Sequence, residues 1–181
     1  MVEDASPDPG LEPTAPQPQN VVVRLGDLAV LQGPAGRLTT FALGSCVAVI
    51  LYDRQRHVGG LLHAFLPDGD DERYRIRVKR QPTLFVRPGL SLLVEQVYAL
   101  RNSNAPDLVA KMAGGASLVG HSGGIAGVGR ANVEAARATL RSLHIRLVAE
   151  DVGEHRVRSA YLELETGRFV VHTHGHGEVV L

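Results

Sequence analysis

Short apolar runs, each bounded by glycine, proline or charged residues, recur along this chain of 181 residues and restrict the folds open to it. Runs of this length with such boundaries predict β-strands. The core has to be built from Val, Leu, Ile and Ala, because the sequence has no Trp and only four Phe and four Tyr. The expected strands are residues 21–30, 38–43, 46–53, 58–66, 108–112, 145–152, 158–165 and 168–172.

Two longer segments, residues 90–101 and 130–143, have helical periodicity. Their apolar stripes are Leu93, Val97 and Leu100 in the first segment, and Val133, Ala136, Leu140 and Leu143 in the second. Because strands outnumber helices and come as hairpins as well as crossovers, we predict an α/β fold of one domain. The expected architecture is a layered sandwich in which a mixed β-sheet is covered by two main helices.

Composition indicates where the folded domain begins and in which compartment the protein is found. Residues 1–20 hold half of the ten prolines and four acidic residues without Lys or Arg, so we expect a disordered tail ahead of a folded domain at residues 21–181. The single cysteine favours a reducing compartment. No basic-then-apolar leader and no apolar run of about 18–20 residues is present, so we expect a cytoplasmic protein without membrane insertion. A formal net charge of zero gives no reason to expect a nucleic-acid partner.

The only cysteine, Cys46, and the histidine His63 lie on two runs that resemble the arms of one hairpin. A two-residue turn at residues 54–55 would pair Asp53 with Arg56 and would place Cys46 directly opposite His63. A neighbouring imidazolium lowers the pKa of a thiol by stabilising the thiolate, and it can return a proton to a leaving group. The pair is therefore a candidate nucleophile with its base. The alternative is a buried cysteine that only fills space.

Three further residues complete the candidate site. Thr40, on the preceding strand, has a hydroxyl that can accept a hydrogen bond from the imidazole and hold the ring in one orientation. Gly44 and Ser45 form a turn that leaves the backbone N–H of Cys46 available to an oxyanion. We expect no metal and no organic cofactor at this site.

The segments that carry these residues resemble the chemoreceptor glutamine deamidase family, CheD. The matching blocks are Thr-Phe-Ala-Leu-Gly-Ser-Cys-Val-Ala-Val at 40–49, Gly-Gly at 59–60 and His-Ala-Phe-Leu-Pro at 63–67. The spacings of six residues from Thr40 to Cys46 and of seventeen from Cys46 to His63 match the family pattern. Further similarity at residues 111–116, 127–132 and 145–153 extends the resemblance over most of residues 21–171.

The resemblance implies that Cys46 is the nucleophile, His63 the general base and acid, and Thr40 the residue that orients the imidazole. It implies hydrolysis of particular glutamine side chains to glutamate on methyl-accepting chemotaxis receptors, through a thioester and without a cofactor. It also implies binding to a chemotaxis phosphatase, CheC. Two other classes stay open: a non-catalytic binding module that regulates such a phosphatase, and another thiol enzyme such as a protease or a transglutaminase.

Three other segments have features of their own. Residues 73–79 alternate cationic and apolar side chains, which predicts an edge strand protected by charge, with contact to acidic receptor helices as the alternative. The glycine-rich residues 120–129 lack the Gly-Lys-Ser/Thr of phosphate-binding loops, so we interpret them as a flexible turn or partner-facing loop. His172, His174 and His176 would share one face of a strand, but at a frayed chain end we expect only adventitious metal binding.

Overall fold

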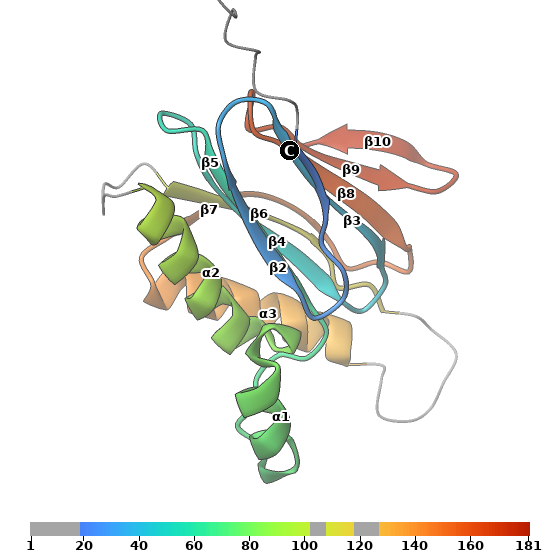
Figure 1. Ribbon diagram of the computed structural model, residues 1–181. Coiled ribbons are helices and arrows are strands. Elements are labelled where there is room, and N and C mark those ends of the chain that lie inside the picture. Colours follow the sequence, from blue (N-terminus) through green and yellow to red (C-terminus); the bar gives the residue numbers. More distant parts are fainter. Residues whose placement is uncertain (1–18, 102–107, 118–126) are drawn as a thin grey trace, which may run out of the picture.

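The computed structural model describes residues 19–101, 108–117 and 127–181, and two five-stranded sheets stack within it (Figure 1). The first sheet contains, in spatial order, β1 (Gln19–Val22), β3 (Gly36–Leu43), β8 (Arg158–Glu163), β9 (Phe169–Thr173) and β10 (Gly177–Val180). The second contains, in spatial order, β2 (Leu28–Gln32), β5 (Val58–Ala64), β4 (Val47–Asp53), β6 (Leu108–Gly114) and β7 (Arg146–Val152). Each sheet is mixed, because β1 pairs with β3 and β6 pairs with β7 in parallel.

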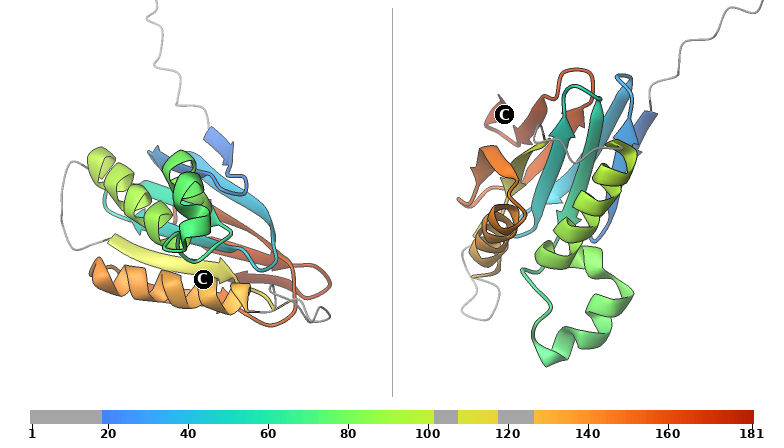
Figure 2. Two further views of the ribbon diagram at one scale, coloured as in Figure 1. Left: turned by 90° about the horizontal axis from the view of Figure 1, so that it is seen from below. Right: turned by 90° about the vertical axis from the view of Figure 1, so that its left-hand side faces the viewer.

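Helices α2 (Val86–Arg101) and α3 (Val128–Ser142) lie on the outer face of the second sheet (Figure 2). The prediction of an α/β layered sandwich in one domain is confirmed, although it gave one sheet where the structure has two. A third, short helix, α1 (Arg75–Arg80), projects below these layers in Figure 1. Two 3-10 turns, η1 (Glu72–Tyr74) and η2 (Pro82–Leu84), flank it.

The central strand β4 is buried along its whole length and separates two layers of the core. Val47, Val49 and Leu51 pack toward the helices, and the residues between them pack against the first sheet. Burial on both faces explains why β4 reads as an unbroken apolar run and not as an alternating one. Helix α2 approaches the sheet closely at Gly60 of β5, where a Cβ atom would lie 2.7 Å from Leu93.

The β4–β5 hairpin forms as expected, but its register differs from the predicted one. Asp53 pairs with Val58 and Ala48 pairs with His63, so the loop has four residues instead of two. The Asp53 carboxylate closes this loop, because it accepts the backbone N–H groups of Gln55 (2.9 Å) and of the next residue (3.1 Å). A shift of two residues preserves the face of each side chain. Cys46 therefore keeps the same side of the sheet as His63, as its diagonal neighbour and not its direct partner.

The prediction of an edge strand at residues 73–79 is wrong, since this segment forms the end of η1 and helix α1. Local contacts at the start of the segment override the alternating pattern. The side chain of Asp71 accepts the backbone N–H of Arg73 and caps the first turn, and Glu72 makes an ion pair with Arg75 three residues later.

The C-terminal residues form a strand where fraying was expected, because β10 pairs with β9 from Gly177 to Val180. His172 lies on β9, whereas His174 and His176 lie in the turn before β10, so the three imidazoles do not share a strand face. Within the described ranges, no group of three His, Cys, Asp or Glu side chains could hold a metal ion.

Two predicted segments lie mainly outside the described residues. Of the tail at 1–20, only residues 19 and 20 are described, and of the loop at 120–129, only residues 127–129 are described. Among the helices of the described ranges, none is long and apolar enough to cross a membrane.

Candidate active site

A pocket of about 300 Å³ opens at the end of the sandwich where β4 begins and β5 ends. The loop that leads from β1 to β2 and the end of β3 supply its rim, and most of its lining is apolar. It is lined by Val22, Val23, Arg24, Leu25, Phe41, Ala42, Cys46 and His63. Three of these side chains are large, apolar and about half exposed: Val22, Leu25 and Phe41. The candidate nucleophile and its candidate base thus meet in one pocket, which has an apolar mouth.

The backbone around Cys46 is fixed by the end of β6. The carbonyl of Cys46 accepts the N–H of Gly115 (2.7 Å), and the carbonyl of Gly44 accepts the N–H of Ala116 (2.8 Å). Gly114 has φ +107°, and a Cβ atom there would lie 2.3 Å from the Cys46 carbonyl oxygen. Only glycine combines this dihedral angle with this close approach.

The predicted turn at Gly44 and Ser45 is present, and the Gly44 N–H donates to the carbonyl of Ala42 (3.0 Å). Within the described part of the chain, the Cys46 N–H donates to no backbone carbonyl, and it favours the thiolate of its own side chain. It is therefore available to an incoming oxyanion.

The Cys46 side chain is 8% exposed and reaches the pocket. Burial raises the pKa of its thiol above the ordinary value, and the backbone N–H of the same residue opposes this effect only in part. Burial thus favours the neutral thiol of Cys46 at neutral pH. This thiol becomes nucleophilic only when a base removes its proton.

His63 is buried and is held by Thr40, as the sequence predicted for this pair. The Thr40 Oγ1 lies 2.8 Å from His63 Nδ1, and it also donates to the carbonyl of Val23 at 2.8 Å. A hydroxyl has one proton, so Thr40 accepts from His63, and the imidazole carries its proton on Nδ1. His63 Nε2 is left with its lone pair, and it has no hydrogen-bond partner among the described residues.

The imidazole is neutral as well. Burial lowers the pKa of His63 to about 4, while the Val23 carbonyl and the negative charge of Asp27 oppose this shift. Burial therefore disfavours the thiolate–imidazolium pair expected from the sequence, and that pair stays a prediction. Desolvation disfavours both ions, and the charged Asp27 does not outweigh it.

A β-bulge at the end of β3 explains how one strand serves both the inside and the rim of the site. The pairing of β3 with β8 shifts between Thr40 and Leu43, and Ala42 has a left-handed φ of +58°. Thr40 is fully buried, whereas the next residue, Phe41, is 54% exposed at the pocket rim. Bulges next to active sites commonly redirect side chains in this way.

Sequence reasoning did not assign two residues that contact this site. The carbonyl of Val23 accepts from Thr40, and a backbone acceptor of this kind leaves no signal in a sequence. The Asn132 side chain donates to the carbonyls of Ser45 and Phe65, both at 2.9 Å. The sequence placed Asn132 at the start of an amphipathic helix but gave no sign that its side chain contacts the site.

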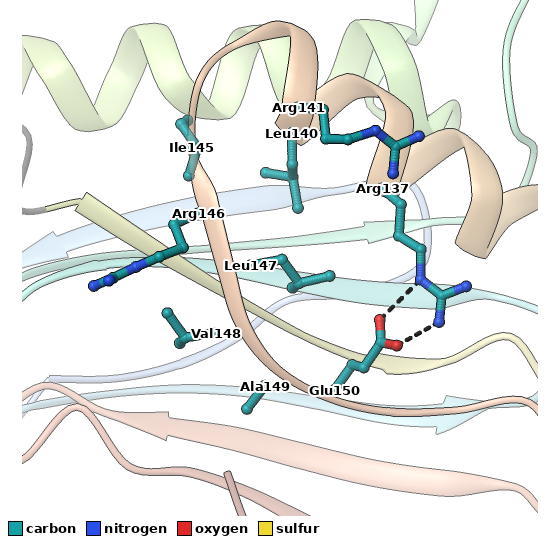
Figure 3. Close-up of a pocket in the computed structure, with 9 residues that line it drawn as sticks. All are labelled: Arg137, Leu140, Arg141, Ile145, Arg146, Leu147, Val148, Ala149 and Glu150. Carbon is teal, nitrogen blue, oxygen red and sulfur yellow. Dashed lines mark hydrogen bonds and ion pairs between the residues drawn. The ribbon is translucent and has the colours of Figure 1, made fainter.

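A larger hollow, of about 420 Å³, lies between α3 and β7 (Figure 3). Its floor is formed by apolar residues such as Leu147, and Arg137 makes an ion pair with Glu150 across it. None of the predicted site residues lines it, and its lining includes no cysteine, histidine or serine. Size alone therefore does not mark the candidate active site.

Comparisons with known proteins identify the family of this chain. A family profile described as "CheD chemotactic sensory transduction" matches residues 65–173. A Pyrococcus horikoshii protein named "Probable chemoreceptor glutamine deamidase CheD" is 41% identical over 163 residues, which are 90% of this chain and 97% of that protein. A Thermotoga maritima protein named "Chemoreceptor glutamine deamidase CheD" is 36% identical over 157 residues, 87% of this chain and 94% of its own length. This chain belongs to the CheD family.

Proposed function

We propose that this protein is a cytoplasmic chemoreceptor glutamine deamidase, in which Cys46, His63 and Thr40 convert specific receptor glutamines to glutamates. The observation that carries the proposal is the one pocket lined by the single thiol and by an imidazole whose Nδ1 is bound to a buried hydroxyl. The names of the related proteins supply the substrate class. The single cysteine, which is typical of a reducing compartment, supports the proposed cytoplasmic location.

In the first half of the reaction, the Cys46 sulfur attacks the side-chain carbonyl carbon of the substrate glutamine. Because thiol and imidazole are both neutral at rest, His63 Nε2 takes the thiol proton as the sulfur–carbon bond forms. The carbonyl π electrons move to oxygen, and the Cys46 N–H binds the oxyanion. The imidazolium is stabilised by Asp27 and the Val23 carbonyl, the groups that oppose the fall in its pKa.

The intermediate then collapses. His63 returns its proton to the amide nitrogen, the carbon–nitrogen bond breaks, and ammonia leaves a thioester on Cys46. In the second half, His63 Nε2 takes a proton from water, whose oxygen attacks the thioester carbon. The carbon–sulfur bond breaks, the sulfur regains a proton from His63, and glutamate is released. Thr40 keeps the Nδ1 proton in place throughout, so that Nε2 is the nitrogen that exchanges protons.

A deamidation assay tests this proposal. Receptor cytoplasmic fragments incubated with the wild-type protein should gain about 1 Da at each converted glutamine, with release of ammonia, because NH₂ is replaced by OH. Cys46→Ala, which leaves the buried side chain apolar, should fold as the wild type does and produce no mass change. Deamidation by Cys46→Ala at the wild-type rate would refute the proposal.

The same assay separates the other classes. A protease would cleave the fragment, and a transglutaminase would join it to an added amine instead of releasing a free carboxylate. A binding module would leave the fragment unchanged, and its effect on a phosphatase would survive in Cys46→Ala.

Binding to a chemotaxis phosphatase is a second, separate proposal, which rests on the family resemblance. We expect the phosphatase to dephosphorylate its substrate faster when this protein is added. Titration of a CheC-type phosphatase with wild-type protein and with Cys46→Ala measures this effect and shows whether it requires the thiol. An unchanged dephosphorylation rate at saturating wild-type protein would contradict this second proposal.

A further inference from the structure

The side chain of Asn132 joins the two strands that carry the candidate nucleophile and base. Asn132 is fully buried in the first turns of α3. Its Nδ2 donates one hydrogen bond to the carbonyl of Ser45, directly before Cys46, and one to the carbonyl of Phe65, two residues after His63. Both distances are 2.9 Å. One amide thus uses both of its protons to hold the open end of the β4–β5 hairpin.

Among the described residues, no hydrogen bond between β4 and β5 holds this end of the hairpin together. The pairing of β4 with β5 ends at Val47 and Ala64. Beyond it the arms separate, because the N–H of Phe65 donates to the carbonyl of Leu84 and the carbonyl of Cys46 accepts from Gly115, directly after β6. The direction of the Ser45 carbonyl is therefore set across the mouth of the hairpin by α3 and not by the sheet.

The orientation of the Asn132 amide is unambiguous. Two carbonyl oxygens face its terminal group, so the nitrogen with its two donors has to lie toward them. Its Oδ1 is buried and has no hydrogen-bond partner among the described residues. An unsatisfied buried acceptor is unfavourable, and this cost is set against the two hydrogen bonds that the nitrogen makes.

The peptide between Ser45 and Cys46 links the Asn132 contact to the candidate active site. A trans peptide is planar, and its C=O and N–H groups point in opposite directions. A hydrogen bond that holds the Ser45 carbonyl toward Asn132 therefore also fixes the Cys46 N–H on the opposite side. That N–H is the oxyanion donor in the proposed reaction.

We propose that Asn132 is a positioning residue for glutamine deamidation: by binding the Ser45 and Phe65 carbonyls, it aims the Cys46 N–H at the oxyanion and keeps Cys46 and His63 in register. The inference rests on the function proposed above and adds a residue that touches neither the substrate nor the reacting atoms.

Two variants and a matched control test the proposal. Asn132→Ala removes both donors, and Asn132→Asp keeps the volume but sets a carboxylate against two carbonyl oxygens. The control is Thr139→Val, a near-isosteric change two turns along the same helix, at a buried residue whose hydroxyl bonds only within α3. Circular dichroism and melting temperature identify which Asn132 variant is folded, and kinetics use that variant.

We expect kcat to fall about 100-fold in the Asn132 variant with KM within a few-fold of wild type, because a misplacement of about 1 Å has an effect of this size. Thr139→Val should keep the wild-type kcat. Cys46 is the only cysteine, so the pH profile of its alkylation by iodoacetamide provides a second readout. The midpoint should rise in the folded Asn132 variant, since the N–H that favours the thiolate is no longer held in place, and should not move in Thr139→Val.

The outcomes separate this inference from the function on which it rests. Deamidation that survives in Cys46→Ala overturns the proposed function. If Cys46→Ala is inactive but the folded Asn132 variant keeps kcat within twofold and an unchanged alkylation midpoint, Asn132 is not a positioning residue. An equal loss of kcat in Thr139→Val would also overturn the inference, since the effect would then belong to α3 as a whole.

Discussion

Acid should destabilise this protein through His63, and the structure gives the size of the effect. The pKa of His63 is about 4 in the folded chain, against 6.5 for an unburied histidine. Below pH 6.5 the unfolded chain therefore binds a proton at this residue that the folded chain does not bind. The free energy of unfolding falls as the pH drops from about 6.5 to 4 and is fully present above that window. A fall in the pKa of His63 from 6.5 to about 4 corresponds to roughly 3 kcal/mol.

The variant His63→Asn isolates this contribution, because the Asn side-chain N–H can still donate to Thr40 but does not titrate. Urea unfolding of both proteins at intervals between pH 7.5 and 4 measures the two free energies. Other histidines and carboxyls contribute to both curves and cancel in the difference. We expect the wild type to lose roughly 3 kcal/mol more than His63→Asn over this range. Curves that stay parallel would show that His63 titrates normally and that the neutral resting pair is incorrect.

Three further predictions concern the site and its support. The alkylation rate of Cys46 should rise with pH through a midpoint above that of a free thiol, because burial raises its pKa; a plateau beginning near pH 5 would instead indicate a thiolate–imidazolium pair. Thr40→Val should lower kcat about 10- to 100-fold by releasing the imidazole, whereas Thr40→Ser should stay near wild type in the deamidation assay. Asp53→Ala should lower the melting temperature by roughly 10 °C, because it removes both the buried ion pair with Arg101 at 2.5 Å and the carboxylate that accepts two backbone N–H groups of the loop. Its kcat at low temperature should hardly change, since Asp53 lies at the opposite end of β4 from Cys46.

The sequence predicted the central strands well and placed the three candidate residues on the strands that bring them together, for a physical reason. A strand buried on both faces, such as β4, has to be apolar throughout, and this pattern is visible without a structure. The short blocks that hold Thr40, Cys46 and His63 are recognisable because their spacing is fixed by the strands on which they lie.

Other features depend on contacts between distant segments or on polar details of turns. The four-residue loop of the β4–β5 hairpin depends on the Asp53 carboxylate, so the register could not be read from the apolar pattern. Helix α1 formed in a segment with strand-like alternation, directly after the turn η1 that Asp71 caps, and such local contacts are not part of the apolar pattern. The neutral state of Cys46 and His63 depends on burial, which the sequence of either strand alone does not report.

The candidate triad is divided between the two sheets, and this division has a mechanical consequence. Thr40 belongs to β3 in the first sheet, whereas His63 belongs to β5 in the second, and their hydrogen bond crosses the interface between the layers. A slip of one layer past the other by a single residue, about 3.3 Å, would carry the hydroxyl out of reach of the ring. The rate of deamidation therefore depends on the relative position of the two sheets. A substitution that weakens the apolar packing between the two sheets should abolish deamidation. The strands within each sheet should stay paired in such a variant.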